Sequence, residues 1–104
     1  MMFNYTTVKN KDCFVVLFEG DLDIDVTEVV EDELIPLLIE KEEVELNLKG
    51  VPFVDSSGIG LLIKLVQALQ VTGVKISIAD VRQEVANIFE LLQLSDILGE
   101  EVIK

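Results

Sequence analysis

Two adjacent serines, Ser56 and Ser57, are the residues best placed to do chemistry, in the stretch Asp55-Ser56-Ser57-Gly58. A serine hydroxyl can act as a nucleophile, cap a helix or carry a phosphate. A nucleophilic serine needs a neighbouring base, and the chain contains no histidine, which excludes Ser-His-Asp and Cys-His arrangements. We therefore expect a protein that is not an enzyme and has no catalytic residue.

The residues after the two serines predict a helix over 57–71. Its apolar side chains nearly surround it, and Thr72-Gly73 ends it. A serine at the start of a helix is most simply an N-cap. The free N–H groups and positive dipole end there also accommodate a phosphate on either serine. Gly58 and Gly60 permit close backbone approach, although a lone Gly-x-Gly is a weak nucleotide signal.

No other side chains form the pattern of a metal or cofactor site. The single cysteine, Cys13, lies in an apolar run and is interpreted as a small core residue of a protein from a reducing compartment. Carboxylates are abundant, but the spacing of a calcium-binding loop is absent. We expect no cofactor and no bound metal.

The acidity of the chain is concentrated in one segment. The formal charge is −12, and residues 19–45 hold 12 acidic residues and one lysine, a net charge of −11. Binding to nucleic acid or to an anionic membrane needs clustered lysine and arginine, so neither partner is expected. We expect the acidic segment to face the basic surface of another protein.

No segment predicts membrane insertion or export. The most apolar stretch, residues 59–66, is interrupted by Lys64, so no run reaches the ~18 residues of a membrane span. The N-terminus lacks the basic and apolar regions of a signal peptide. We therefore expect a cytoplasmic protein with no direct membrane insertion.

Hydropathy patterns predict the strands of a single domain over residues 1–104. Residues 3–8 predict an edge strand, and the continuous apolar run 13–18 predicts a central strand covered on both faces. Residues 44–48 and 74–78 alternate strictly, which predicts strands with helices mainly on one face of the sheet.

Two further helices complete the predicted fold. The apolar positions within residues 26–38 recur with the spacing of one helix face. Asp23 or Asp25 is expected to cap this helix, and Pro36 is expected to kink it or end it early.

The end of the chain is predicted to hold one more helix and one more strand. Asp80 is predicted to cap a third helix through about residue 92, followed by a turn at 94–98 and a last strand at 101–103. The order is ββαβαβαβ, an α/β fold with a mixed, mostly parallel sheet.

The block around the serines resembles a known family. Residues 53–60, Phe-Val-Asp-Ser-Ser-Gly-Ile-Gly, follow an alternating strand and open an apolar helix, and they resemble the signature of the STAS domain of bacterial anti-sigma factor antagonists. Residues 20–23, Gly-Asp-Leu-Asp, resemble the turn after the family's second strand. Val85, Ile88 and Phe89, with Leu94, resemble positions of its third helix and the turn that follows. The resemblance covers essentially the whole chain.

The resemblance implies a function in bacterial signalling and transcription regulation by partner switching. The unphosphorylated chain would bind an anti-sigma factor that is also a serine kinase, and so free a sigma factor. The kinase would phosphorylate Ser56, with Ser57 as second choice, and a PP2C-type phosphatase would reverse the reaction. The surroundings of the phosphosite and the partner surface would be Asp21, Asp23, Asp55, Ser57, Gly58, Ile59 and Gly60. In the alternative, the chain is a non-catalytic STAS subunit of a transport complex or signalling scaffold, and Ser56 is only a cap.

Overall fold

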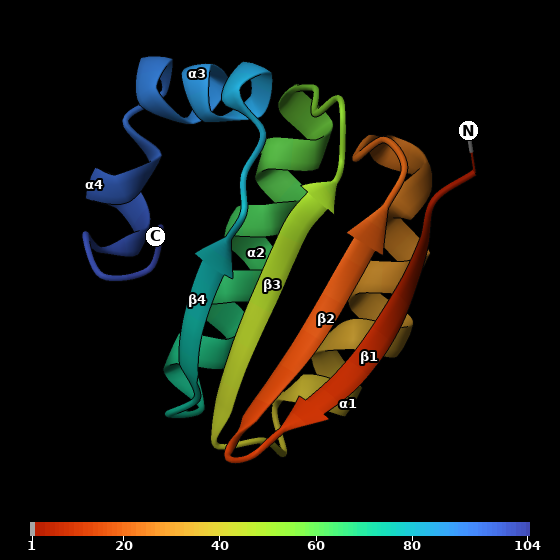
Figure 1. Cartoon of the computed structure of the whole chain (residues 1–104), viewed down its shortest axis with the longest axis vertical. Helices are drawn as coiled ribbons and strands as arrows, with labels where there is room; N and C mark the ends of the chain where they lie inside the picture. The colour runs from red at the N-terminus through yellow and green to blue at the C-terminus, as the bar shows by residue number, and fades with distance from the viewer. Residues whose placement is uncertain (1) are drawn as a thin grey trace.

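A computed structural model describes residues 2–104 as a helix-backed, four-stranded sheet (Figure 1). The strands lie in the order β1-β2-β3-β4, and β1 is antiparallel to β2 while β2, β3 and β4 are parallel. The strands are β1 (Asn4–Asn10), β2 (Cys13–Glu19), β3 (Glu43–Gly50) and β4 (Lys75–Ala79). The α/β class and the mixed, mostly parallel sheet are confirmed, as is the position of the first strand at an edge.

The helices connect the parallel strands and then complete the chain. Between β2 and β3 lie η1 (Ile24–Val26), η2 (Val29–Leu34) and α1 (Ile35–Leu38), and between β3 and β4 lies α2 (Ser56–Val71). After β4 come α3 (Gln83–Leu91) and α4 (Leu94–Leu98). Figure 1 shows α2 and the η1–α1 segment behind the sheet, which confirms that the helices lie mainly on one face.

Side-chain alternation along the strands builds the core between the sheet and these helices. Val44, Leu46 and Leu48 of β3 are fully buried, and the residues between them are only half-buried. In β2 the same alternation buries Val16 and Phe18 but leaves the intervening side chains half-buried. The expectation that residues 13–18 are covered on both faces is therefore wrong, because none of the helices within residues 2–104 packs on the second face of β2.

Cys13 lies at the first position of β2, on this second face. It is half-buried, so its interpretation as a core residue is also wrong. A continuous apolar run cannot by itself distinguish a strand covered on both faces from one that is half-covered on its second face.

The predicted first helix is divided into three short pieces around Pro36. Pro36 has no N–H, and in a regular helix its ring would collide with the carbonyl four residues earlier. The preceding residues instead form the wider π-helix η2, in which the N–H of Ile35 reaches the carbonyl of Val30. The last piece, α1, includes Pro36 and ends at Leu38, the last residue of the predicted helix, so Pro36 does not end the helix early. It instead interrupts the regular helix, because the residues before it form the π-helix.

The third helix begins later than predicted. Its first residue is Gln83 with Arg82 at the N-cap position, so the expectation that Asp80 caps it is wrong. Asp80 has a positive φ of 56° and accepts a hydrogen bond of 2.8 Å from the side-chain amide of Asn47. The Nε of Arg82 donates to the carbonyl of Lys49 at 2.7 Å. These two contacts hold the chain after β4 against β3 and delay the helix.

Two predictions for the end of the chain are also corrected. Residues 94–98 form the helix α4 instead of a turn, and Leu94 and Leu98 bury their side chains in the core. Residues 101–103 form one bridge, between Ile78 and Ile103, instead of a strand. The observed order is therefore ββαβαβ followed by two helices, with the last residues lying along β4.

Candidate functional site

The two motifs that flank the serines meet at one edge of the sheet. The parallel strands β2 and β3 end there, so the loops that follow them lie side by side. The N–H of Leu22 donates to the carbonyl of Phe53 at 3.0 Å, and the N–H of Asp55 donates to the carbonyl of Leu22 at 3.2 Å. Leu22 and Val54 form a parallel bridge. The turn at residues 20–23 is therefore fixed beside the serines, as the resemblance implied.

Asp55 caps α2, and neither serine does. Its backbone is extended, and its carboxylate accepts the N–H of Gly58 at 2.9 Å. Asp55 occupies the position before the first helical residue, from which a side chain reaches the N–H three residues on. The serines are the first and second residues of the helix itself, past the capping position. The interpretation of a serine as the cap is therefore wrong, and Asp55 holds this loop.

Ser56 is the more accessible of the two serines. It is the first residue of the 16-residue helix α2 and is exposed, whereas Ser57 is half-buried. The N-terminus of a helix carries a partial positive charge, so a negatively charged group on Ser56 would lie in a favourable field. The geometry thus offers the hydroxyl of Ser56 to another protein and tolerates an anion on it.

The three residues after the serines have different roles from one another. A side chain at Gly58 would collide with the carbonyl oxygen of Leu22, so this glycine permits the close approach of α2 to the turn after β2. Gly60 has open space around it, and its expected part in a close approach is wrong. Ile59 is only 5% exposed and belongs to the core, so it cannot form the expected contact with a partner.

The acidic turn borders a depression that has apolar side chains in its wall. Asp21, Asp23 and Asp25 line this depression of about 530 Å³ together with Phe3 and Val26, and no lysine or arginine lines it. The carboxylate of Asp23 also accepts the N–H of Asp25 at 3.0 Å and so caps η1. Asp23, one of the two predicted caps, is the one that the structure uses. The arrangement presents carboxylates around a partly apolar surface.

The sequence reasoning missed two exposed apolar residues beside this turn. Ile24 is 65% exposed and Phe53 is 50% exposed. Ile24 lies among aspartates and outside the helical spacing of the core positions Val26 and Val30, a signal that could have identified it. Phe53 is followed by the buried Val54, and alternation alone could have placed it outside the core.

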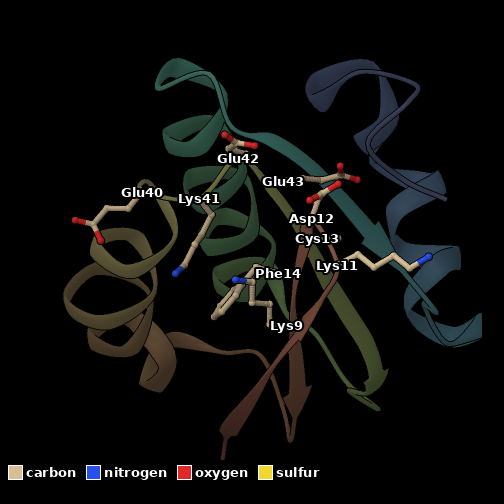
Figure 2. A pocket seen from close by; sticks show the side chains of 9 residues that line it. All are labelled: Lys9, Lys11, Asp12, Cys13, Phe14, Glu40, Lys41, Glu42 and Glu43. Atoms are coloured by element: carbon tan, nitrogen blue, oxygen red, sulfur yellow. The ribbon is translucent and has the colours of Figure 1, made fainter.

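A second pocket, of about 300 Å³, lies at the opposite end of the strands, beside the hairpin between β1 and β2. Figure 2 shows Lys9 and Lys41 gathered around Phe14, while Glu40 extends away from them. The Nζ of Lys41 lies 4.5 Å from the centre of the Phe14 ring, a cation–π contact. The pocket mixes lysines with carboxylates.

Cys13 also lines this pocket. Burial raises the pKa of its thiol, and the carboxylates of Glu43 and Glu45 raise that pKa further. The thiol therefore stays protonated at neutral pH, which disfavours reactivity. Within residues 2–104 no group of three histidine, cysteine or carboxylate side chains could hold a metal ion. In the same part of the chain no helix is long and apolar enough to span a bilayer.

The sequence profile of the STAS domain matches residues 4–103, nearly the whole chain. The chain belongs to the STAS domain family. This STAS domain is 28% identical over 99 residues to an anti-sigma-B factor antagonist of Staphylococcus epidermidis, a match that covers 94% of this chain and 92% of that protein.

Solved structures of two other proteins share its fold. The phosphorylated form of SpoIIAA, a cell fate determinant of Bacillus, matches with a TM-score of 0.68 and 17% identity over 97% of this chain and 89% of that one. A sulfate transporter family protein of Wolinella succinogenes matches with a TM-score of 0.77 and 18% identity over 92% and 79% of the two chains. Identities this low establish the common fold alone.

Proposed function

We propose that this STAS domain is an anti-sigma factor antagonist, a binding protein and not an enzyme. In its unphosphorylated form it binds an anti-sigma factor serine kinase, which then frees a sigma factor. Phosphorylation of Ser56 inactivates it. The observation that carries the proposal is the exposed Ser56 at the start of α2, directly beside the acidic turn that Leu22 fixes with backbone hydrogen bonds. The relation to the anti-sigma-B factor antagonist supports the same role.

Accessibility favours Ser56 over Ser57 as the modified residue. A kinase must reach the hydroxyl from solvent, and Ser57 is half-buried while Ser56 is exposed. Capping by Asp55 also favours Ser56, because the helix start does not depend on either serine hydroxyl. The same exposure would let a PP2C-type phosphatase reach the phosphate and restore the binding form.

The phosphate would act at the interface and leave the fold unchanged. It adds a charge of about −1.5 to −2. The N-terminus of α2 attracts it by about 0.3–1 kcal/mol at an exposed site. Asp21, Asp23 and Asp55 repel it, and salt screens that repulsion over about 8 Å. Neither effect is large enough to rearrange a packed domain, and the phosphorylated SpoIIAA structure with the same fold supports this conclusion.

The surface around Ser56 suits a partner with a basic, partly apolar face. The carboxylates of the acidic turn would attract lysine and arginine side chains and speed the encounter. The exposed Ile24 and Phe53 would serve as apolar anchors within that charged surround. A doubly negative phosphate on Ser56 would then add both bulk and unmatched charge at the contact.

The alternative function is that of a non-catalytic STAS subunit in a transport complex or signalling scaffold. The fold likeness to the sulfate transporter family protein is the observation in its favour. That likeness comes with 18% identity and shows the fold alone. The relative named as an antagonist matches at 28% over 94% of this chain, which favours the first function.

Phosphate transfer from ATP distinguishes the two functions. The chain would be incubated with ATP and each anti-sigma factor kinase of the source organism, and the phosphate located by mass spectrometry. We expect one phosphate on Ser56, none in the Ser56→Ala variant, and normal transfer in the matched Ser57→Ala variant. Failure of every kinase to transfer phosphate, or transfer to a residue other than Ser56, would contradict the proposal.

A further inference from the structure

Within the described residues 2–104, the strand β1 leaves one edge of the sheet open. β1 is the first strand in the sheet order, and all of its residues except Tyr5 are exposed. The opposite edge is covered, because the N–H of Ile78 in β4 donates to the carbonyl of Val102 at 2.7 Å and its carbonyl accepts the N–H of Lys104 at 2.9 Å. A free strand edge presents unpaired N–H and C=O groups on which another strand can pair.

The hairpin geometry determines which residues of β1 face the open edge. Asn10 pairs with Cys13 across a two-residue turn, and a two-residue turn is closed by a hydrogen-bonded pair. Every second residue back from Asn10 is therefore bonded to β2. The residues between them, Tyr5, Thr7 and Lys9, direct their backbone N–H and C=O groups away from β2 and toward solvent.

We propose that β1 pairs with β1 of a second copy of this chain, antiparallel about a two-fold axis at Thr7. In this register Thr7 lies opposite the partner subunit's Thr7, and Tyr5 lies opposite the partner subunit's Lys9. All three outward-facing residues of each copy then form hydrogen-bonded pairs. A shift of the register by two residues would lose one of the three pairs.

Charge complementarity favours a second copy as the occupant. The hydroxyl of Tyr5 donates to a carboxylate oxygen of Glu33 at 3.0 Å. Side chains of directly opposed residues on one face run side by side, so Lys9 would reach the partner subunit's Glu33. Lys9 forms no ion pair within the described residues 2–104 of a single copy, and Figure 2 shows it beside Phe14. Pairing of two copies would supply that ion pair twice.

The composition of β1 allows this pairing. A lysine at the centre of an edge strand opposes self-association, because two copies would place like charges together. The only charged residue of β1 is Lys9, two residues from the centre at Thr7, so it meets the partner subunit's Tyr5 instead of itself. Tyrosine, threonine and valine, which favour strands, occupy the middle positions.

The net charge limits the strength of the dimer. Each copy carries −12, which opposes association, and physiological salt screens this repulsion over about 8 Å. We therefore expect a weak dimer that forms in the micromolar range or above. This inference does not depend on the proposed function, because β1 does not include Ser56 or its acidic turn.

Sedimentation velocity over a concentration series at physiological salt tests the dimer. We expect the wild-type chain to shift from monomer to dimer as its concentration rises, and Thr7→Pro to remain monomeric. Proline at Thr7 removes only an outward-facing N–H, and proline is tolerated at such edge positions. Thr7→Val keeps the N–H and should dimerise like the wild type. Circular dichroism of each variant establishes that the chain is folded.

A charge reversal tests the register independently of proline. Lys9→Glu places two carboxylates together and should weaken the dimer several-fold, and the double variant Lys9→Glu with Glu33→Lys should restore it. In the wild type, amide hydrogen exchange at Tyr5, Thr7 and Lys9 should slow as concentration rises, while Thr6 and Val8 are protected at every concentration. A wild-type chain that stays monomeric, or a folded Thr7→Pro variant that still dimerises, would overturn the proposal.

Discussion

Asp55 and Ser56 are neighbours at the start of α2 and have separate tasks. The carboxylate of Asp55 caps the helix through the N–H of Gly58, and Ser56 keeps an exposed position at the first helical residue. Modification of Ser56 therefore need not weaken the helix start. The sequence predicted the start of this helix to within one residue, but the choice of cap depends on the backbone angles of Asp55, which sequence alone does not specify.

At the residue level, ionisation of Tyr5 should lower the free energy of unfolding at alkaline pH. Burial raises its pKa above the ordinary value of 10.0, and the hydrogen bond to Glu33 and that carboxylate's charge raise it further. Because the pKa of Tyr5 is higher in the folded state, the stabilisation that its protonated hydroxyl gives is fully present below the unfolded-state pKa. That stabilisation is lost as pH rises through the folded-state pKa.

The Tyr5→Phe variant tests this dependence. Between about pH 9 and pH 11 it should lose less stability than the wild type, because the variant has no phenol to ionise. Urea unfolding midpoints at the two pH values measure the difference. An alkaline loss in Tyr5→Phe as large as that of the wild type would show that Tyr5 contributes nothing.

At the level of elements, the contact between α2 and the turn after β2 holds the candidate site together. Gly58 lies against the backbone of Leu22, whose N–H and carbonyl are both bonded to the loop before α2. Because both sides of this contact are backbone, neither can move aside as a flexible side chain could. The acidic turn and Ser56 are thus held at a fixed separation by the packing of one glycine.

Two matched alanine variants in the same helix test this contact. Gly58→Ala should destabilise the fold by about 1–3 kcal/mol, as overpacking of a rigid site does. Gly60→Ala meets open space and should be neutral or stabilising by about 0.5–1 kcal/mol, because alanine favours a helix over glycine. Urea denaturation of both variants gives the two values. Equal changes in the free energy of unfolding for the two variants would mean that the close contact between Gly58 and Leu22 does not limit the side chain at position 58.

The helices and strands that the sequence predicted well are those encoded by a pattern of neighbouring residues. The alternation of residues 44–48 and the apolar residues after Ser56 are local patterns, and β3 and α2 were found close to their observed bounds. The delayed start of α3 depends on contacts of Asp80 and Arg82 with β3, 33 residues away in sequence, which no local pattern encodes. The π-helix before Pro36 was missed for a different reason, since a proline predicts a break but not how the chain absorbs it.

At the level of the whole molecule, the helices lie mainly on one face of the sheet, and Ser56, the proposed phosphosite, lies at the edge where β2 and β3 end. The −11 charge of residues 19–45 was predicted to lie on the partner side, and its turn at residues 20–23 lies directly beside Ser56. A switch at such a surface needs no change of fold. The proposed function rests on this arrangement, with phosphate blocking a contact between two otherwise unchanged proteins.

The most direct test compares the affinity of the unphosphorylated chain and of the Ser56-phosphorylated chain for the same anti-sigma factor kinase, by titration calorimetry. Like charges forced together at an interface cost several kcal/mol, so we predict binding weakened by about a hundredfold or more. NMR spectra of the two free forms should differ only in residues around Ser56. Equal affinities, or spectral changes spread across the sheet, would contradict the proposed switch.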